Sequence, residues 1–300
     1  MTPHIAAILV NYNAGIELEH ALASIAGELG SRPWEAIVID NASSDGSDAI
    51  AERFAATVRV IRNRENVGFG QGVNQGLAAT TAPVVLIMNP DCYLAPGALT
   101  TLEAELLSYA TCAIVGPRVL DPGGTEQGSA RGDPDMLTGL FGRASGLRRW
   151  FPGLSVSRRN VVLAGDQETD TSTVVEWLSG ACMLARHDAL ADARGFDPRY
   201  FMYWEDADLC RRLRGRGYHV RYVPRATAVH RVGQSSRSVR SASIRWFHES
   251  AYVYYSTHVA PGPYNPKRLL ARVLLAIRCW WRLRQSASDE LRHVLRDRQA

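Results

Sequence analysis

Short apolar runs alternate with helical segments over the first third of the chain. Four short, mostly apolar runs rich in β-branched residues lie at residues 5–10, 36–39, 58–61 and 84–88. Between them, residues 16–29 and 49–56 repeat apolar positions at the helical period. Strands without polar alternation are typical of a parallel sheet that helices cover on both faces. The pattern therefore predicts an α/β fold with the order βαβα.

Polar residues or glycines follow each of these four predicted strands, in segments 11–13, 40–46, 63–76 and 89–91. Ligands of open α/β sheets bind at the carboxyl ends of the strands, so we expect these segments to form one site. Segment 66–76 is predicted to be a glycine-rich loop ahead of a short helix, whose glycines would let backbone amides approach a ligand closely. They lack the G-x-G-x-x-G spacing and do not follow the first strand, which disfavours an NAD enzyme.

The pattern is less regular after Val115. Residues 121–146 are rich in Gly, Asp and Arg, which predicts a long loop or mobile flap. A second segment begins near Val174. In it we expect a strand at 177–184, an aromatic and acidic segment at 201–206 leading into a helix through Leu213, short strands at 218–223 and 226–230, and a helix at 244–255.

Composition narrows the class of protein. The 300 residues are 46% hydrophobic and 21% charged, which excludes disordered, collagen-like and disulfide-scaffold chains. A net charge of +4 does not favour nucleic acid as a partner. The five cysteines form no C-x-x-C pair, which predicts reduced thiols and a cytoplasmic location. The N-terminus is predicted to be a strand and not a signal peptide, and no apolar run approaches the roughly 20 residues that span a bilayer, so we expect a soluble or membrane-surface protein.

Four polar positions are candidates for chemistry, and each has a structural alternative. Asp91 ends an Asn-Pro-Asp segment after a strand, where it suits a divalent cation or a simple turn. His230 ends another strand and is either a second metal ligand or a hydrogen-bonded structural residue. Asp206 follows an aromatic run, which suits a general base, but acidic residues in a first helical turn also complement the helix dipole. Asp40 could accept a hydrogen bond from a pyrimidine base, while 41–47 also suits a turn and helix cap.

Taken together, six segments closely resemble the family 2 glycosyltransferases with the GT-A fold, particularly their bacterial rhamnosyltransferase-like branch. The segments are Val10-Asn-Tyr-Asn13, Asp40-Asn-Ala-Ser-Ser-Asp-Gly46, Asn66-Val-Gly-Phe-Gly-Gln-Gly-Val-Asn74, Asn89-Pro-Asp91, Trp177-Leu-Ser-Gly-Ala181 and Phe201-Met-Tyr-Trp-Glu-Asp206. The resemblance covers roughly residues 5–255. It implies a Rossmann-like mixed α/β sheet flanked by helices, followed by a C-terminal helical extension.

The resemblance implies an inverting transfer of a sugar from a nucleotide-diphosphate donor to a hydroxyl of a lipid-linked or polysaccharide acceptor in cell-envelope glycan synthesis. The commonest donor of the branch is dTDP-L-rhamnose, and UDP- or GDP-sugars are alternatives. The resemblance places the base at Asp206 and a divalent cation, Mg2+ or Mn2+, on Asp91 and His230. It implies a sugar and acceptor pocket at Trp177, Gly180, Trp204 and Glu205. The residues implied for the donor nucleotide are Asn11, Tyr12, Asn13, Asp40, Asn66, Gly68, Phe69, Asn74, Asn89 and Asp91.

One position departs from the family pattern. The metal motif of many relatives has two aspartates, and Asn89 replaces the first of them here. The motif therefore keeps Asp91 as its carboxylate, which predicts a modest affinity for the cation.

We expect residues 1–260 to form the GT-A domain, with a nucleotide-sugar half at 1–116, a flexible loop region at 117–172 and an acceptor and catalytic half at 173–260. Residues 261–300 are predicted to be a basic amphipathic helical extension. Arg268, Arg272, Arg278 and Arg282 fall in one stripe, and the other faces carry Leu269, Leu270, Val273, Leu274, Ile277, Trp280 and Trp281. Such a helix either lies on the anionic inner leaflet of the membrane or docks its apolar face on the body or on a second subunit as a homodimer.

Two other function classes stay open at this point: a nucleotidyltransferase that makes sugar nucleotides, and a catalytically silent sugar-nucleotide binder. The first would normally carry a glycine-rich basic phosphate signature near the N-terminus, and residues 8–14 have none. The second predicts nucleotide binding without turnover.

Overall fold

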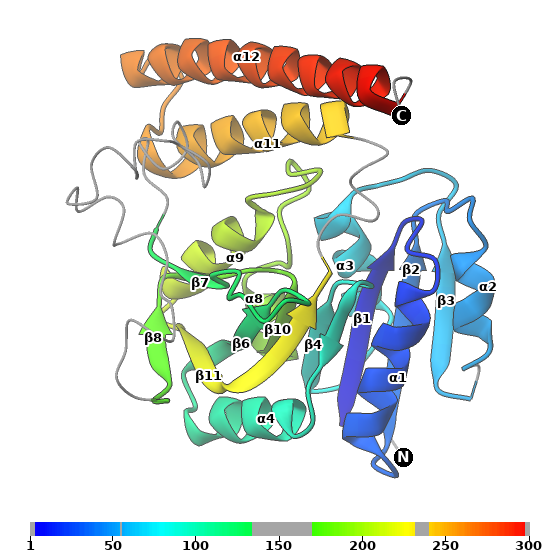
Figure 1. Cartoon of the computed structure of the whole chain (residues 1–300). Helices are drawn as coiled ribbons and strands as arrows, with labels where there is room; N and C mark the ends of the chain where they lie inside the picture. Colours follow the sequence, from blue (N-terminus) through cyan, green and yellow to red (C-terminus); the bar gives the residue numbers. More distant parts are fainter. Residues whose placement is uncertain (1–3, 55, 134–169, 232–239, 298–300) are drawn as a thin grey trace.

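A mixed sheet forms the centre of the computed structural model, which describes residues 4–54, 56–133, 170–231 and 240–297, and side chains up to residue 288 (Figure 1). Within these residues the sheet has nine strands in the order β3-β2-β1-β4-β10-β6-β11-β5, with β8 paired to β11. The strands are β1 Ile5–Asn11, β2 Trp34–Asp40, β3 Val58–Arg62, β4 Val84–Met88, β5 Cys92–Leu94, β6 Cys112–Leu120, β8 Thr173–Val175, β10 Cys182–Arg186 and β11 His219–His230. A separate pair joins β7 Ala130–Arg131 to β9 Trp177–Leu178.

The helices lie on both faces of this sheet and beyond its upper edge (Figure 1). They are α1 Glu17–Leu29, α2 Ser47–Glu52, α3 Phe69–Ala78, α4 Ala98–Ser108, α8 His187–Asp192, α9 Glu205–Arg214, α11 Arg240–Tyr254 with a π-helical turn Tyr255–Val259, and α12 Pro266–Asp297. This arrangement confirms the expected mixed α/β fold flanked by helices.

The strands predicted from apolar runs are confirmed, and β3, β2, β1 and β4 pair in parallel. Successive residues of β1 point to opposite faces of the sheet. Leu9 packs with Leu18 and Leu22 of α1, whereas Ile8 packs in the cluster that includes Val73 of α3. Both faces of this strand are therefore covered, which is why its sequence is apolar throughout.

Five local predictions differ from the structure. The glycine-rich segment is largely helical, because α3 already begins at Phe69. The single strand expected at 177–184 is two strands, β9 and β10, separated by a turn at 179–181. The helix expected at 49–56 is the shorter α2, and the two strands expected at 218–230 are one strand with a register shift between Val223 and Thr227. The expected flap at 121–146 contains β7, and its part from 134 onward lies outside the described residues.

Close packing of α3 explains why its glycines are compatible with a helix. A Cβ on Gly76 would lie 2.6 Å from Cγ2 of Ile8 in β1. The absence of a side chain thus lets α3 approach the sheet more closely than a helix with side chains at this position.

The C-terminal helices form a separate layer above α9 and α3 (Figure 1). Helix α11 lies between α12 and the rest of the domain, and its Trp246 and Phe247 stack on aromatic residues of the loop before α9. This layer therefore borders the edge of the sheet where a site is expected.

Candidate functional site

A buried polar network follows β1 and β2. Nδ2 of Asn11 donates to Oδ1 of Asp40 at 2.8 Å and lies 2.8 Å from Oγ of Ser47 at the start of α2. The other carboxylate oxygen of Asp40 accepts from the backbone N–H of Ser43 at 3.1 Å. Asn11 is fully buried. Asn11 therefore orients Asp40, and its predicted contact with the nucleoside stays a prediction.

Asn13 and Tyr12 lie at the edge of this network and are partly exposed. Asn13 has a positive φ of 51°, and its Oδ1 accepts from the backbone N–H of Ser44 at 2.8 Å. The loop after β1 is thus tied to the loop after β2, with Tyr12 at its tip.

The segment before α3 contacts both the loop after β2 and the loop before α9. Asn41 donates to Oδ1 of Asn66 at 3.1 Å and to the carbonyl of Gly68 at 3.2 Å. Gly68 has φ +86°, and a Cβ there would lie 2.2 Å from the carbonyl oxygen of Phe201. The N–H of Phe69 donates to that same carbonyl at 3.0 Å. A glycine is thus required where the predicted donor loop meets the segment that leads to Asp206.

Asn74 ties α3 to the loop before α9. Its Nδ2 donates to the carbonyl of Phe196 and its Oδ1 accepts from the N–H of Phe196, both at 2.8 Å. These two bonds use one of its two amide hydrogens and one acceptor position of its oxygen, and its predicted contact with the nucleotide stays a prediction.

Asp91, which follows β4, and His230, at the end of β11, lie side by side. Nε2 of His230 is 3.2 Å from Oδ1 of Asp91, and both side chains are 12% exposed. Asn89 contributes Nδ2 at 3.2 Å from the same imidazole nitrogen. An asparagine can donate a hydrogen bond to a neutral imidazole, whereas an ionised aspartate in its place could only accept.

Gln127 fixes the orientation of His230, and sequence reasoning missed it. Its Nε2 donates to the carbonyl of His230 at 2.7 Å, so its Oε1 faces Nδ1 of the imidazole, 3.0 Å away, as an acceptor. Nδ1 therefore carries the proton in the neutral ring, and the lone pair of Nε2 points toward Asp91 and Asn89. Histidines that bind metals are commonly held by such a partner on the other ring nitrogen. No sequence signal identified Gln127, because it lies in a segment predicted to be a mobile loop.

These contacts fit a divalent cation with few protein ligands. One carboxylate and one imidazole nitrogen converge at Asp91 and His230, and within the described residues there is no cluster of three or more His, Cys, Asp or Glu that could hold a metal. A cation here would need further oxygen ligands from water or a bound diphosphate.

Asp206 lies beside the turn at 179–181. Its Oδ2 accepts from the N–H of Gly180 at 2.9 Å, and a Cβ on Gly180 would meet the ring of Phe69 at 3.2 Å. The next residue of the turn, Ala181, accepts from the N–H of Asn89 at 2.9 Å. The turn therefore has Asp206 on one side and the Asn89–Asp91 segment on the other. Asp206 is partly exposed, so its carboxylate can be reached from solvent.

Glu205 and Trp204 precede Asp206 and differ in burial. Glu205 is buried, and burial, together with the nearby charge of Asp206, raises the pKa of Glu205 well above its usual range. Trp204 is partly exposed, and its ring packs against Phe247 and Tyr254, with centroids 5.7 and 5.4 Å apart. The predicted contact of these two residues with an acceptor stays a prediction.

Trp177 is held by the short β7–β9 pair. Its Nε1 donates to the carbonyl of Gly132 at 2.9 Å, and the guanidinium of Arg131 lies 5.1 Å from the ring centroid. The indole is partly exposed, so it can still border a ligand.

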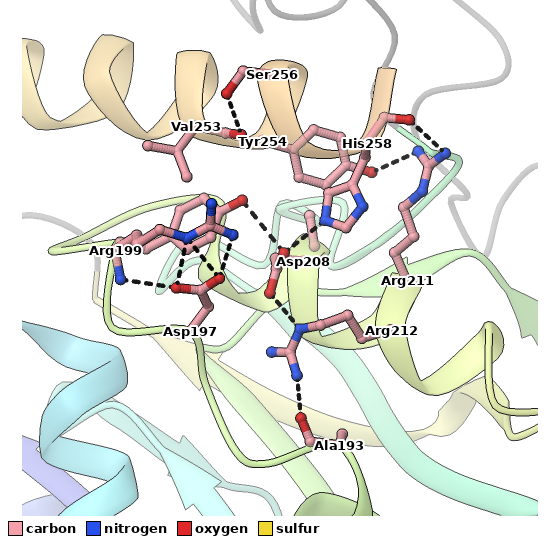
Figure 2. Close-up of polar contacts among 12 residues, drawn as sticks. Ala193, Asp197, Arg199, Asp208, Arg211, Arg212, Val253, Tyr254, Ser256 and His258 are labelled. Atoms are coloured by element: carbon pink, nitrogen blue, oxygen red, sulfur yellow. Dashed lines mark hydrogen bonds and ion pairs between the residues drawn. The ribbon is translucent and has the colours of Figure 1, made fainter. Parts of the chain in front are cut away.

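A charged network behind Asp206 joins α9 to the C-terminal layer (Figure 2). Asp208 is fully buried; its Oδ2 accepts from Arg212 at 2.7 Å, and its Oδ1 is 2.6 Å from Nε2 of His258 in the π-helical turn. The guanidinium of Arg211 donates to the hydroxyl of Tyr254 and to the carbonyl of His258, each at 3.2 Å. Burial raises the pKa of Tyr254 to about 12, so its hydroxyl stays protonated at neutral pH. This network holds the helix that carries Asp206, and sequence reasoning missed it because Asp208 and His258 are 50 residues apart.

The fold and this site define a glycosyltransferase. Residues 6–159 match the family model described as glycosyl transferase family 2, and residues 155–248 match the model described as glycosyltransferase like family 2. The chain therefore belongs to glycosyltransferase family 2.

Two relatives refine this placement. The chain is 30% identical to the N-acetylglucosaminyl-diphospho-decaprenol L-rhamnosyltransferase of Mycobacterium tuberculosis over 309 residues, which cover 99% of this chain and 98% of the relative. It is 42% identical to the rhamnosyltransferase WbbL of Escherichia coli over 84 residues, which cover 28% of this chain and 32% of that one. The expected resemblance to the rhamnosyltransferase-like branch is confirmed.

Solved structures support the fold assignment. The mannosyltransferase PcManGT of Pyrobaculum calidifontis, in complex with GDP-Man and Mn2+, matches with a TM-score of 0.56 at 18% identity, covering 96% of this chain and 74% of that one. GalNAc-T7 with UDP, GalNAc and Mn2+ matches with a TM-score of 0.59 at 16% identity, covering 91% and 54%. At these identities the likeness confirms the GT-A fold and nothing finer.

Proposed function

We propose that this protein transfers L-rhamnose from dTDP-L-rhamnose, with inversion, to a hydroxyl of a lipid-linked acceptor in cell-envelope glycan synthesis. The observation that carries the sugar and the acceptor class is the 30% identity to a decaprenol-linked rhamnosyltransferase over 99% of this chain. The placement of Asp206 and Asp91 on either side of the turn at 179–181 supports transfer as opposed to binding alone.

Asp206 is proposed as the general base. Its carboxylate takes the proton of the acceptor hydroxyl as the hydroxyl oxygen forms a bond to the anomeric carbon. The bond from that carbon to the diphosphate oxygen breaks on the opposite face, and its electron pair leaves with the nucleotide diphosphate. Burial and the charge of Asp206 raise the pKa of the neighbouring Glu205, which disfavours a second negative charge beside the base.

The donor is proposed to lie along the carboxyl ends of β1, β2 and β4. Asp40, held by Asn11, is placed to accept from the base, and the backbone around Gly68 and Phe69 borders the nucleoside. Asp91 and His230 would hold a divalent cation, which neutralises the charge of the departing diphosphate when it is bound. Gln127 keeps the imidazole in the tautomer that this requires.

We further propose a peripheral position at the inner face of the cell membrane. An acceptor on a lipid carrier confines the reaction to the membrane surface, and cysteine usage predicts a reducing compartment. Within the described residues, no helix combines the length and hydropathy needed to cross a bilayer.

Asp206→Asn tests the proposed base. Loss of a general base typically lowers turnover by about 10² to 10⁴-fold, and the amide keeps the size of the side chain and an oxygen for the Gly180 N–H. Turnover should therefore fall by this factor while the dissociation constant for the donor stays the same. Asp192→Asn, on the exposed end of α8, is the matched control and should leave both unchanged. Full turnover in Asp206→Asn would remove Asp206 from the mechanism.

Asp91→Ala and Gln127→Leu test the proposed cation site without measuring turnover. Titration of the intact chain with Mn2+ and the nucleotide diphosphate should show weaker binding for both variants. Removal of a residue that orients a metal ligand typically costs 10 to 100-fold in affinity, roughly the loss expected for Gln127→Leu. Nucleotide binding that is insensitive to a chelator in the wild type would refute the cation role.

A panel of nucleotide sugars tests the donor. A ligand that binds the folded protein stabilises it by an amount that increases with the logarithm of its concentration relative to its dissociation constant, so dTDP-L-rhamnose should raise the unfolding temperature more than UDP- or GDP-sugars at equal concentration. Stabilisation by a UDP- or GDP-sugar alone would reassign the donor and leave the glycosyltransferase assignment intact.

A further inference from the structure

Helix α12 turns its apolar face away from the rest of the protein. Its outward apolar residues are each between 47% and 69% exposed, and they are Leu269, Leu270, Val273, Ile277, Trp280 and Trp281. They extend along about 18 Å of the helix at 1.5 Å per residue. We call this set the outer face of α12. A contiguous apolar surface with two tryptophans marks an interaction site.

The opposite side of α12 carries arginines and packs on α11. The guanidinium of Arg278 lies 5.6 Å from the ring centroid of Phe247, and its Nη1 is 3.2 Å from Nε2 of His248. Arg272 lies 5.7 Å from the ring centroid of Tyr252. The expectation that the helix docks its apolar face on the body of the protein is therefore wrong. Cation–π contacts hold the basic stripe instead, which leaves the outer face without a partner in the described chain.

Charge around the outer face favours a lipid surface over a second copy of the chain. Residues 266–288 contain no Asp or Glu, and Lys267, Arg272 and Arg284 are exposed on this part of the helix. Arg284 lies 4.1 Å from the ring centroid of Trp280, so a cation and an indole lie together at one end of the stripe. Two copies meeting through this face would bring like charges together, whereas an anionic bilayer matches both the apolar stripe and its cationic border.

Helix α11 connects this surface to the loop before Asp206. Phe247 contacts Arg278 on its upper side and the rings of Tyr203 and Trp204 on its lower side, at centroid distances of 5.9 and 5.7 Å from the two rings. A membrane bound at α12 would therefore lie on the side of the molecule that carries the edge of the site (Figure 1).

We infer that the outer face of α12 inserts into the interfacial region of an anionic bilayer, with the helix parallel to the membrane plane and its arginine stripe kept on α11. This inference rests on the proposed transfer to a lipid-linked acceptor and assigns the contact to particular side chains. Insertion of the apolar stripe supplies affinity, and the exposed cations supply the preference for anionic lipid.

The test is sedimentation of the intact chain with phosphatidylcholine vesicles that contain or lack phosphatidylglycerol. The variants are Ile277→Asn and Trp280→Ser, whose side chains are exposed in the free protein, so folding is expected to be unaffected. Leu107→Asn, at an exposed position of α4 on the far side of the domain, is the matched control. Wild type and Leu107→Asn should sediment with the phosphatidylglycerol vesicles, and each α12 variant should bind them about tenfold more weakly or worse.

Two results would overturn the inference: equal sedimentation of wild type and both α12 variants, or no sedimentation of the wild type with either vesicle. A dimer in analytical ultracentrifugation that Ile277→Asn converts to a monomer, without vesicle binding, would assign the face to a second copy and also overturn it. Transfer to a short water-soluble acceptor separates this inference from the proposed function. The α12 variants should keep transfer to this soluble acceptor. If the wild type binds vesicles but does not transfer sugar to this acceptor, the proposed function would be refuted and the membrane contact of α12 would stand.

Discussion

The same substitution, glycine to alanine, should have opposite effects in two helices of this protein. Gly76 in α3 faces β1, where a Cβ would lie 2.6 Å from Cγ2 and 3.0 Å from Cδ1 of Ile8. Gly27 in α1 is exposed, and a Cβ there would have no heavy atom within 4 Å. The comparison thus separates helix propensity, which both positions share, from packing, which only Gly76 involves.

The expected magnitudes follow from these contacts. Alanine is favoured over glycine inside a helix by about 1 kcal/mol, so Gly27→Ala should raise the free energy of unfolding by up to about that amount. At Gly76 the gain is opposed by overpacking, which typically costs about 1–3 kcal/mol. Ile8 cannot easily yield, because it is fully buried in a central strand and its branched Cβ restricts rotation. We therefore expect Gly76→Ala to be less stable than Gly27→Ala by about 1–3 kcal/mol.

Urea denaturation followed by far-UV circular dichroism measures both free energies. Equal denaturant slopes in the two variants are required for the comparison. If Gly76→Ala were as stable as Gly27→Ala, the close approach of α3 to β1 would be refuted. Because α3 begins at Phe69 in the proposed donor site, Gly76→Ala should also weaken donor binding, while Gly27→Ala should leave it unchanged.

Three further predictions concern buried charge. Asp208→Asn leaves the charge of Arg212 without its buried partner and should lower the free energy of unfolding by about 3–5 kcal/mol. Asp192→Asn removes an exposed ion pair and should change this free energy by at most about 1 kcal/mol. Equal losses for the two variants in urea denaturation would contradict the burial of the network around Asp208. Because the pKa of Glu205 is raised in the folded state, this residue contributes fully to the free energy of unfolding below about pH 4.5, where it is protonated. The contribution is lost as pH rises through the folded-state pKa. Glu205→Gln should therefore gain thermal stability relative to wild type at neutral pH and not at pH 4, and a pH-independent difference would count against the shift. Burial lowers the pKa of His248, so its neutral imidazole stabilises the fold fully above about pH 6.5, and this stabilisation is lost as pH falls through the folded-state pKa. His248→Gln should therefore flatten the decline in unfolding temperature between about pH 6.5 and 5. If the variant shows the same decline as wild type, His248 is not its source.

The sequence predicted those parts of the fold that depend on residues close together along the chain. β1, β2 and β4 were predicted because each contains a continuous apolar run, which a strand covered on both faces keeps wherever it lies in the sheet, whereas the edge strand β3 was predicted from its β-branched residues although Arg59 interrupts it. The family was also predictable, because six short segments occur in a characteristic order and the family models match the same chain. The proposed roles of Asp206 and Asp91 come from this resemblance and stay predictions.

Sequence by itself therefore determined the α/β class, the family and the amphipathic character of the C-terminal helix. Tertiary structure decided that Gln127 orients His230 from 103 positions away, that Asn11 orients Asp40, that Asn74 holds the backbone of Phe196, and that α12 turns Arg278 toward α11. The physical reason is the range of the interactions. Periodicity and strand propensity act over a few residues, whereas hydrogen-bond partners and the covered face of a helix depend on which distant segments the fold brings into contact.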